Sequence, residues 1–165
     1  MPEANIRFEP IVPKGRIVDA TKMLSGLKGA CAHWGNIARD DFKKTTNAWK
    51  TPVDFSNKQI AQGGSLEQIV GTSNVIYGYI DQGTRAHWVF PRKGGMLAFR
   101  SKWRNATRPR VISSSTRWTG GAMAFSRGHR VGGIPARYFA ATIADRRERN
   151  FHNLCQNAVR DAIQH

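Results

Sequence analysis

The sequence predicts an α+β fold in which a small antiparallel β-sheet packs against a long N-terminal and a long C-terminal helix. Near both ends of the chain, apolar residues recur at spacings of three and four, which is the periodicity of an amphipathic helix. Between these regions, short runs of β-branched and aromatic residues are separated by turn residues, as in β-strands. The 165 residues have the length of one domain. We expect an extended N-terminal arm, 1–14, and a single domain, 15–165.

The N-terminal arm contains Pro2, Pro10 and Pro13, which exclude a helix. Apolar residues alternate between these prolines, so we expect the arm either to add an edge strand to its own sheet or to reach a neighbouring subunit. The stripe from Ile17 to Phe42 then predicts an amphipathic helix of roughly 30 residues.

Several strands are expected in the middle of the chain, and the segment 47–64 is expected to be a loop. The predicted strands are 66–72, 75–80, 87–90, 96–100 and 108–113. The first two should form a hairpin, 75–100 should contribute three strands to one sheet, and Pro109 should confine 108–113 to an edge or a bulge. The aromatic residues of these strands are expected to be core: Tyr77, Tyr79, Trp88, Phe90 and Phe99. A tight turn at Gly83 and Thr84 should give Gly83 a positive φ.

The segment 114–133 is polar and glycine-rich, and its apolar residues are isolated. We expect a projecting loop or long hairpin that contacts other subunits through Trp118, Met123 and Phe125. The last helix is expected to open at Pro135, because proline suits a first helical position. Its apolar stripe continues to Ile163. At the charged run 145–150 we expect the helix either to kink or to be exposed to solvent where it crosses the domain.

The two cysteines, Cys31 and Cys155, lie on the apolar stripes of the two predicted helices. We therefore expect small buried thiols, and neither a disulfide nor a nucleophile.

The net charge of +15 is concentrated in one interval, because no acidic residue occurs between Asp81 and Asp145. Such a block repels itself unless it meets an anion, which could be nucleic acid, an acidic protein surface or an anionic lipid. A solvated face is the remaining explanation. The basic residues of the interval are Arg85, Arg92, Lys93, Arg100, Lys102, Arg104, Arg108, Arg110, Arg117, Arg127, Arg130 and Arg137.

The sequence contains no motif that indicates catalysis. It has no Gly-x-Gly-x-x-Gly, no phosphate-binding loop, no His-Glu-x-x-His and no nucleophile elbow. A metal-dependent nuclease would need converging carboxylates, which the basic interval lacks. We therefore expect neither an enzyme nor a cofactor nor a metal site. No apolar run approaches the roughly 20 residues of a membrane span.

Several short motifs resemble those of the minor tail and tail-completion (neck) proteins of long-tailed bacteriophages. The resemblance runs from Leu66 to the C-terminus. Its motifs are Tyr77, Gly83-Thr84, His87-Trp88, Pro91, Leu97-Ala98-Phe99 and the segment Gly133-Ile134-Pro135-Ala136-Arg137-Tyr138-Phe139. The acidic residue that usually directly precedes Gly-Thr in that family is replaced here by Gln82, with Asp81 one place earlier. The usual His-Pro-Gly before the last helix is also altered, in 128–133.

The resemblance implies a structural virion protein that is assembled in the bacterial cytoplasm and resides in the neck. Subunits of this kind form a homo-oligomeric ring, here expected to be six-fold, around the DNA channel. The implied partners are the head connector or adaptor and the tail terminator or tube proteins. The basic interval would then face either double-stranded DNA or a protein neighbour.

The alternative function, suggested by charge, is a stand-alone, sequence-independent nucleic-acid-binding protein. Such a binder should interleave exposed aromatic and basic residues. The expectation that most aromatic residues are strand core favours the virion protein, with Trp103 and Trp118 as exceptions because basic residues flank them.

Overall fold

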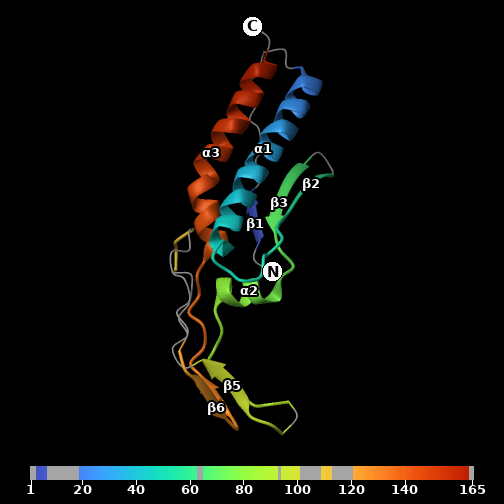
Figure 1. Ribbon diagram of the computed structural model, residues 1–165. Coiled ribbons are helices and arrows are strands. Elements are labelled where there is room, and N and C mark those ends of the chain that lie inside the picture. Colours follow the sequence, from blue (N-terminus) through green and yellow to red (C-terminus); the bar gives the residue numbers. More distant parts are fainter. Residues whose placement is uncertain are drawn as a thin grey trace.

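The computed structural model describes residues 3–6, 19–62, 65–92, 94–100, 109–112 and 121–163. The expected α+β fold is confirmed. Helices α1 (Ala20–Thr46) and α3 (Phe139–Ala162) lie side by side, and a small antiparallel sheet packs against them (Figure 1).

Helix α1 forms where the periodicity predicts it. The Asp19 carboxylate caps its first turn by accepting a hydrogen bond of 2.9 Å from the Lys22 amide, and Lys43 and Lys44 lie in its last turn, where the helix dipole favours positive charge. Its buried stripe includes Trp34 and Phe42. Across the interface with α3, Trp34 packs edge-on against Phe151, with ring centroids 5.4 Å apart.

The sheet has the order β1-β3-β2, with strands Glu3–Ile6, Ser65–Gly71 and Ser56–Gln62 respectively. The arm therefore adds an edge strand to its own sheet at 3–6, which was one of the two expectations; the rest of the arm lies outside the described residues. The predicted strand 66–72 is confirmed as β3.

The expectation of a loop over 47–64 is wrong, because β2 occupies Ser56–Gln62 and forms the hairpin with β3. This strand is polar and mostly exposed at the sheet edge. Hydrophobic alternation therefore gave no sign of it, since alternation marks only strands with a buried face.

The predicted strand 75–80 is also wrong, because Val75–Gln82 forms helix α2. The Asn74 side chain caps this helix by accepting a 3.0 Å hydrogen bond from the Tyr77 amide. Tyr77 is fully buried, with ring centroids 5.1 Å from Phe55 and 5.7 Å from Phe139. The cap by Asn74 and the burial of Tyr77 thus outweigh the β-propensity of residues 75–80.

The remaining strands form a unit that projects from the helices, which we call the distal module (Figure 1). The module comprises the described residues of 84–100 and 121–134. Its strands are β4 (His87–Val89), β5 (Leu97–Arg100), β6 (Met123–Ser126) and β7 (His129–Val131). The predicted strands 87–90 and 96–100 are confirmed as β4 and β5. They do not share a sheet with each other or with 75–80, because β4 pairs with β7 and β5 pairs with β6.

The segment 114–133 was expected to be a projecting loop or long hairpin. Its described part, 121–133, belongs to the projecting module, but it is not a hairpin, because β6 pairs with β5 and β7 pairs with β4. The predicted strand 108–113 is wrong over 109–112, which the structure shows as a turn and a bend. There Arg110 adopts φ 58°, and its amide donates a 2.9 Å hydrogen bond to the Arg137 carbonyl.

Helix α3 begins at Phe139, so the expectation that it opens at Pro135 is wrong. The residues before it are held out of the helix, because Ile134 bridges to Thr84 and the amides of Arg137 and Tyr138 bond to the Asp81 carbonyl. Tyr138 itself adopts a left-handed conformation with φ 56°. The charged run 145–150 lies within the unbroken helix and is largely exposed.

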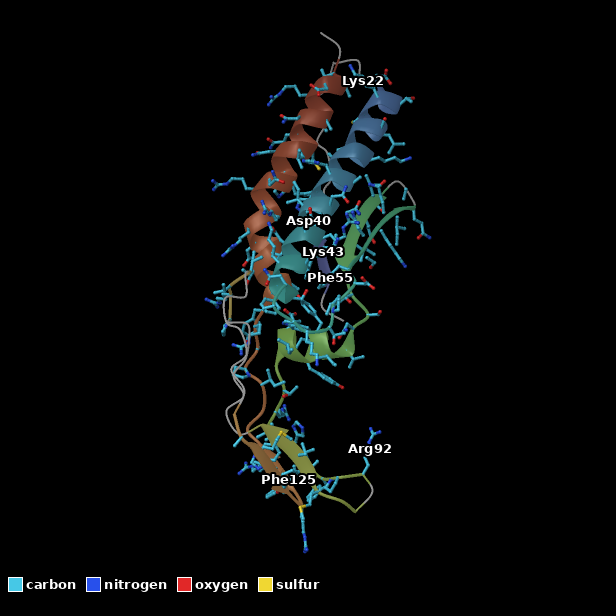
Figure 2. All side chains as sticks on the ribbon, viewed as in Figure 1. Lys22, Asp40, Lys43, Phe55, Arg92 and Phe125 are labelled. Atoms are coloured by element: carbon cyan, nitrogen blue, oxygen red, sulfur yellow. The ribbon has the colours of Figure 1, made fainter. Side chains whose placement is uncertain are left out.

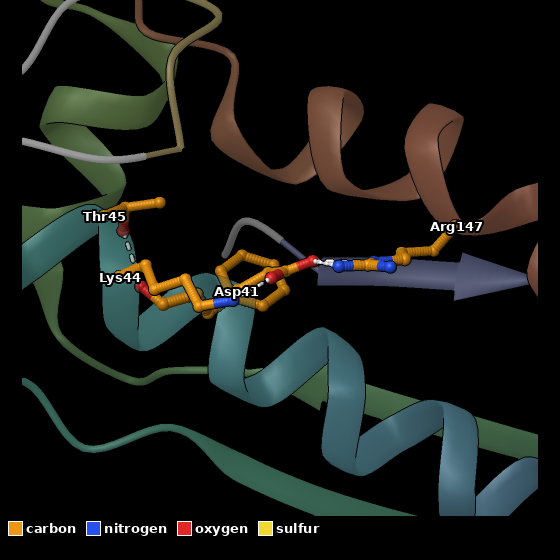
Figure 3. Close-up of polar contacts among 5 residues, drawn as sticks. Asp41, Lys44, Thr45 and Arg147 are labelled. Carbon is orange, nitrogen blue, oxygen red and sulfur yellow. Dashed lines mark hydrogen bonds and ion pairs between the residues drawn. The ribbon is translucent and has the colours of Figure 1, made fainter.

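Between the long helices, the buried Asp41 carboxylate accepts from Arg147 of α3 at 2.6 Å and from Lys44 at 2.9 Å, as Figure 3 shows. Cys31 and Cys155 are free and buried, as expected.

Gly83 supports a first test of this architecture. Its φ of 79° and ψ of 171° are confined to glycine, and an added Cβ would lie 2.7 Å from the Ile134 carbonyl oxygen. We expect Gly83→Ala to lower the free energy of unfolding by at least about 1–3 kcal/mol, the cost of the strained backbone alone, as measured by urea denaturation. Gly95→Ala is the control, because nothing lies within 4 Å of an added Cβ there. Equal stability of the two variants would contradict the assignment.

Candidate interaction surface

The distal module is joined to the helical body by a compact junction around Asp81, at the end of α2. The Asp81 backbone carbonyl accepts hydrogen bonds of 3.0 Å from the amides of Arg137 and Tyr138, and its carboxylate accepts one of 3.2 Å from the Ala140 amide. This carboxylate acts as the N-cap of α3, because Tyr138 at the helix start provides no side-chain cap. Sequence reasoning missed this role, since the capping residue lies far from the helix in the chain.

The environment of Asp81 shifts its acidity. The residue is only 6% exposed, and burial raises the pKa of its carboxyl group, while hydrogen bonds from the amides of Ala140 and Phe139 lower it in part. The net direction is upward, so the folded protein binds this proton more tightly than the unfolded chain does.

Arg137 does not belong to an exposed basic surface, and its expected role in DNA or partner docking is wrong. It is 6% exposed, and burial lowers the pKa of its guanidinium group. Its Nε atom has no hydrogen-bond partner among the described residues. The motif that contains Arg137 therefore builds the junction.

The other described arginines of the basic interval are exposed. Arg85, Arg92, Arg127 and Arg130 belong to the distal module, and Arg110 lies beside the start of α3. Arg92 extends from the loop between β4 and β5 (Figure 2). The Arg100 backbone lies in β5, but nothing is described of its side chain. The remaining predicted residues lie outside the described part of the chain: Lys93, Lys102, Arg104, Arg108, Arg117 and Trp118.

Most of the aromatic residues expected in the strand core are exposed, so that expectation is wrong. Only Tyr77 is buried and Phe99 is half-buried, whereas Tyr79, Trp88 and Phe90 are exposed. Alternation predicts a buried face only where a second layer covers it. Within the described residues, the two-stranded pairs of the distal module have no such layer over Trp88 and Phe90.

Trp88 of β4 and Phe90, the residue directly after this strand, form a stacked pair of rings. Their exposed fractions are 60% and 65%, and their rings are 6.0 Å apart with an interplanar angle of 15°. Trp88 lies directly opposite Arg130 in the β4–β7 register. Phe90 lies against Gly128, where an added Cβ would be 2.8 Å from the ring.

Further apolar side chains are exposed elsewhere on the distal module and on α2. Met123 and Phe125 of β6 are exposed, and Figure 2 shows Phe125 at the end of the molecule away from the long helices. On α2, Val75, Ile76 and Tyr79 are also exposed. Within the described residues, α2 and β6 thus expose apolar side chains that belong neither to the core nor to the Trp88–Phe90 pair.

The described residues contain no group of three or more His, Cys, Asp and Glu side chains that could hold a metal ion. Within the same residues, no helix is both long and apolar enough to cross a membrane.

Comparisons with protein-family models, with curated proteins and with solved structures find no match to this chain. Its likeness to tail-completion proteins therefore rests on the sequence motifs alone.

The role of Asp81 as the cap of α3 can be tested by substitution, because one substitution removes the acceptor of the Ala140 amide and another keeps it. Asp81→Ala should lose about 1 kcal/mol of stability, since the Ala140 amide is left without its acceptor. Asp81→Asn retains an oxygen acceptor and is the matched control. Denaturation of both variants, compared with the unsubstituted protein, measures the difference.

The pH dependence of Asp81 follows from the upward direction of its pKa. Its protonation stabilises the fold below the ordinary pKa of 3.8, and this contribution is lost as pH rises through the folded pKa. The stability of Asp81→Asn relative to the unsubstituted protein should therefore increase from acidic to neutral pH. A difference that is constant with pH would contradict the assignment.

Proposed function

We propose that this chain is a structural virion protein, a tail-completion or neck subunit that forms a ring joining the head connector to the tail tube around the DNA channel. The observation that carries the proposal is the distal module, which projects from the helical body and exposes large apolar side chains together with arginines. The motifs that resemble tail-completion proteins supply the particular assembly and its expected six-fold symmetry.

The composition of the exposed surfaces supports an assembly role. Protein interfaces are enriched in aromatic residues, methionine and arginine, which are the types exposed on the distal module. Large apolar side chains clustered on a free surface commonly mark a contact site.

Two unlike apolar surfaces on one subunit suit a closed ring. A head-to-tail ring contact joins different patches of neighbouring copies. In the proposed ring, Met123 and Phe125 of one copy contact Val75, Ile76 and Tyr79 of the next copy.

The charge of the distal module indicates what the ring contacts. Arg85, Arg92, Arg127 and Arg130 are exposed, and no acidic residue lies between Asp81 and Asp145. These arginines lie on strands and loops instead of on one face of a helix that could enter the major groove. We therefore propose contact with DNA phosphates or with an acidic rim of the connector or tube, without recognition of base sequence.

A second candidate function is stand-alone, sequence-independent binding of nucleic acid. The exposed Trp88–Phe90 pair beside Arg130 favours it, because interleaved aromatic and basic residues are what such a binder needs.

The ring proposal is tested by Phe125→Ser. The side chain is 64% exposed, so we expect a stable fold but a subunit that fails to contact its neighbour. Mass photometry of the purified protein and the amount incorporated into particles measure the effect. Leu24→Ser, at an exposed apolar position on α1, is the control. Normal incorporation of Phe125→Ser would remove this surface from the assembly.

The electrostatic contact with double-stranded DNA is tested by its salt dependence. If about six phosphates are neutralised, log affinity plotted against log salt should have a slope of about −5. Replacing Arg127 and Arg130 together by Gln should reduce the steepness by about two units. Arg160→Gln, near the exposed end of α3, is the control. An unchanged slope in the double variant would show that these two arginines face solvent and do not contact DNA phosphates.

A further inference from the structure

We propose that Trp88, Phe90 and Arg130 form a binding site for single-stranded nucleic acid, in which unpaired bases stack on the two rings and the arginine contacts a phosphate. This inference deepens the second candidate function by naming its site and ligand class, and it does not depend on ring assembly.

The two rings have the geometry of a stacking platform. Trp88 lies in β4 and Phe90 directly follows the strand, and their side chains lie beside each other. Their centroid separation of 6.0 Å and their angle of 15° define an offset, nearly parallel pair. Because both side chains are mostly exposed, each ring retains surface on which a base could stack.

The Phe90 ring is positioned by the opposite side of the module. Its atoms Cε1 and Cδ1 lie 2.8 and 2.9 Å from the place that a Cβ on residue 128 would occupy. Only glycine at that position lets the ring lie there. Gly128 does not have a positive φ, so alanine would displace the ring without straining the backbone.

Arginines lie opposite the pair in the strand register and close to it in the chain. Arg130 is directly opposite Trp88 on β7, and Arg92 follows Phe90 in the connecting loop. Arg127 is also exposed nearby in the chain. No ion pair within the described residues neutralises these three arginines. Aromatic stacking combined with a cationic path for phosphates is how proteins bind single strands without sequence preference.

A single strand fits this site better than a duplex or a protein. The bases of a duplex stack on one another, so their faces are closed to Trp88 and Phe90. An acidic protein surface could pair with the arginines, but its charged groups would not stack on two parallel exposed rings. The combination of features therefore favours unpaired bases.

The test uses fluorescence anisotropy of the full chain with a labelled oligothymidine of about 12 nucleotides, within the site sizes of such binders. Trp88→Ala and Phe90→Ala should each weaken binding roughly ten-fold or more, because each removes one stacking partner. Gly128→Ala should weaken it in the same direction, because it displaces the Phe90 ring. Leu24→Ala is the control, an exposed apolar position on α1 that lies outside both proposed contact surfaces, and it should bind as the unsubstituted protein does.

A second probe separates stacking from charge. An abasic oligonucleotide of the same length carries the same phosphates but no bases. It should bind the unsubstituted protein more weakly than oligothymidine binds Trp88→Ala, because it loses stacking on both rings, and it should be insensitive to that substitution. Duplex DNA should likewise be insensitive to it.

Several results would overturn the site. These are absence of oligothymidine binding at low salt, unchanged affinity of Trp88→Ala and Phe90→Ala, or an equal loss in Leu24→Ala. Loss of assembly in Trp88→Ala with unchanged oligonucleotide affinity would assign the rings to a protein contact and would also overturn it. Failure of the ring proposal, measured with Phe125→Ser, is a separate result and leaves the stacking site standing.

Discussion

The arrangement of the whole chain depends on the hydrogen bonds that converge on Asp81. Its carbonyl holds the amides of Arg137 and Tyr138, and its carboxylate caps α3 at Ala140. The distal module leaves the body at Gly83 and returns just before these amides. One acidic residue therefore fixes the end of α2, the base of the module and the start of α3 relative to one another.

The body and the distal module are stabilised differently. In the body, Trp34, Phe42, Tyr77 and Phe139 are fully buried, and Asp41 is paired with Arg147 across the long helices. Removing Arg147 would be costly, because the buried Asp41 carboxylate would keep only Lys44 as a cationic partner. The module has only short strand pairs and half-buried contacts such as Phe99 against His129. A unit of this kind exposes its side chains to a partner, whereas the body supplies the stability.

Helical periodicity was readable from the sequence because both long helices bury a continuous stripe against each other. The strands β4 and β5 were also located correctly, but their pairing was not, because the partners of short strands are set by contacts distant in the chain. Val75–Gln82 was mistaken for a strand, since nothing local shows that Tyr77 enters an aromatic core. The candidate surface was only half predicted: the arginines were identified by charge, but the exposure of Trp88 and Phe90 depends on the absence of a covering layer within the described structure.

Because Arg137 is buried, the arginines of the basic interval do not all belong to one exposed surface. A count of charges treats every arginine of the interval alike, whereas the structure uses this one in the junction and exposes Arg85, Arg92, Arg127 and Arg130 on the distal module. Exposed charge and exposed apolar side chains thus occupy the same projecting unit. A purely apolar partner would leave the arginines desolvated without compensation, and a purely anionic one would leave Phe125 and Met123 in water. The proposed partners would fit this composition, because a protein neighbour would cover the apolar side chains and a phosphate backbone would pair with the arginines.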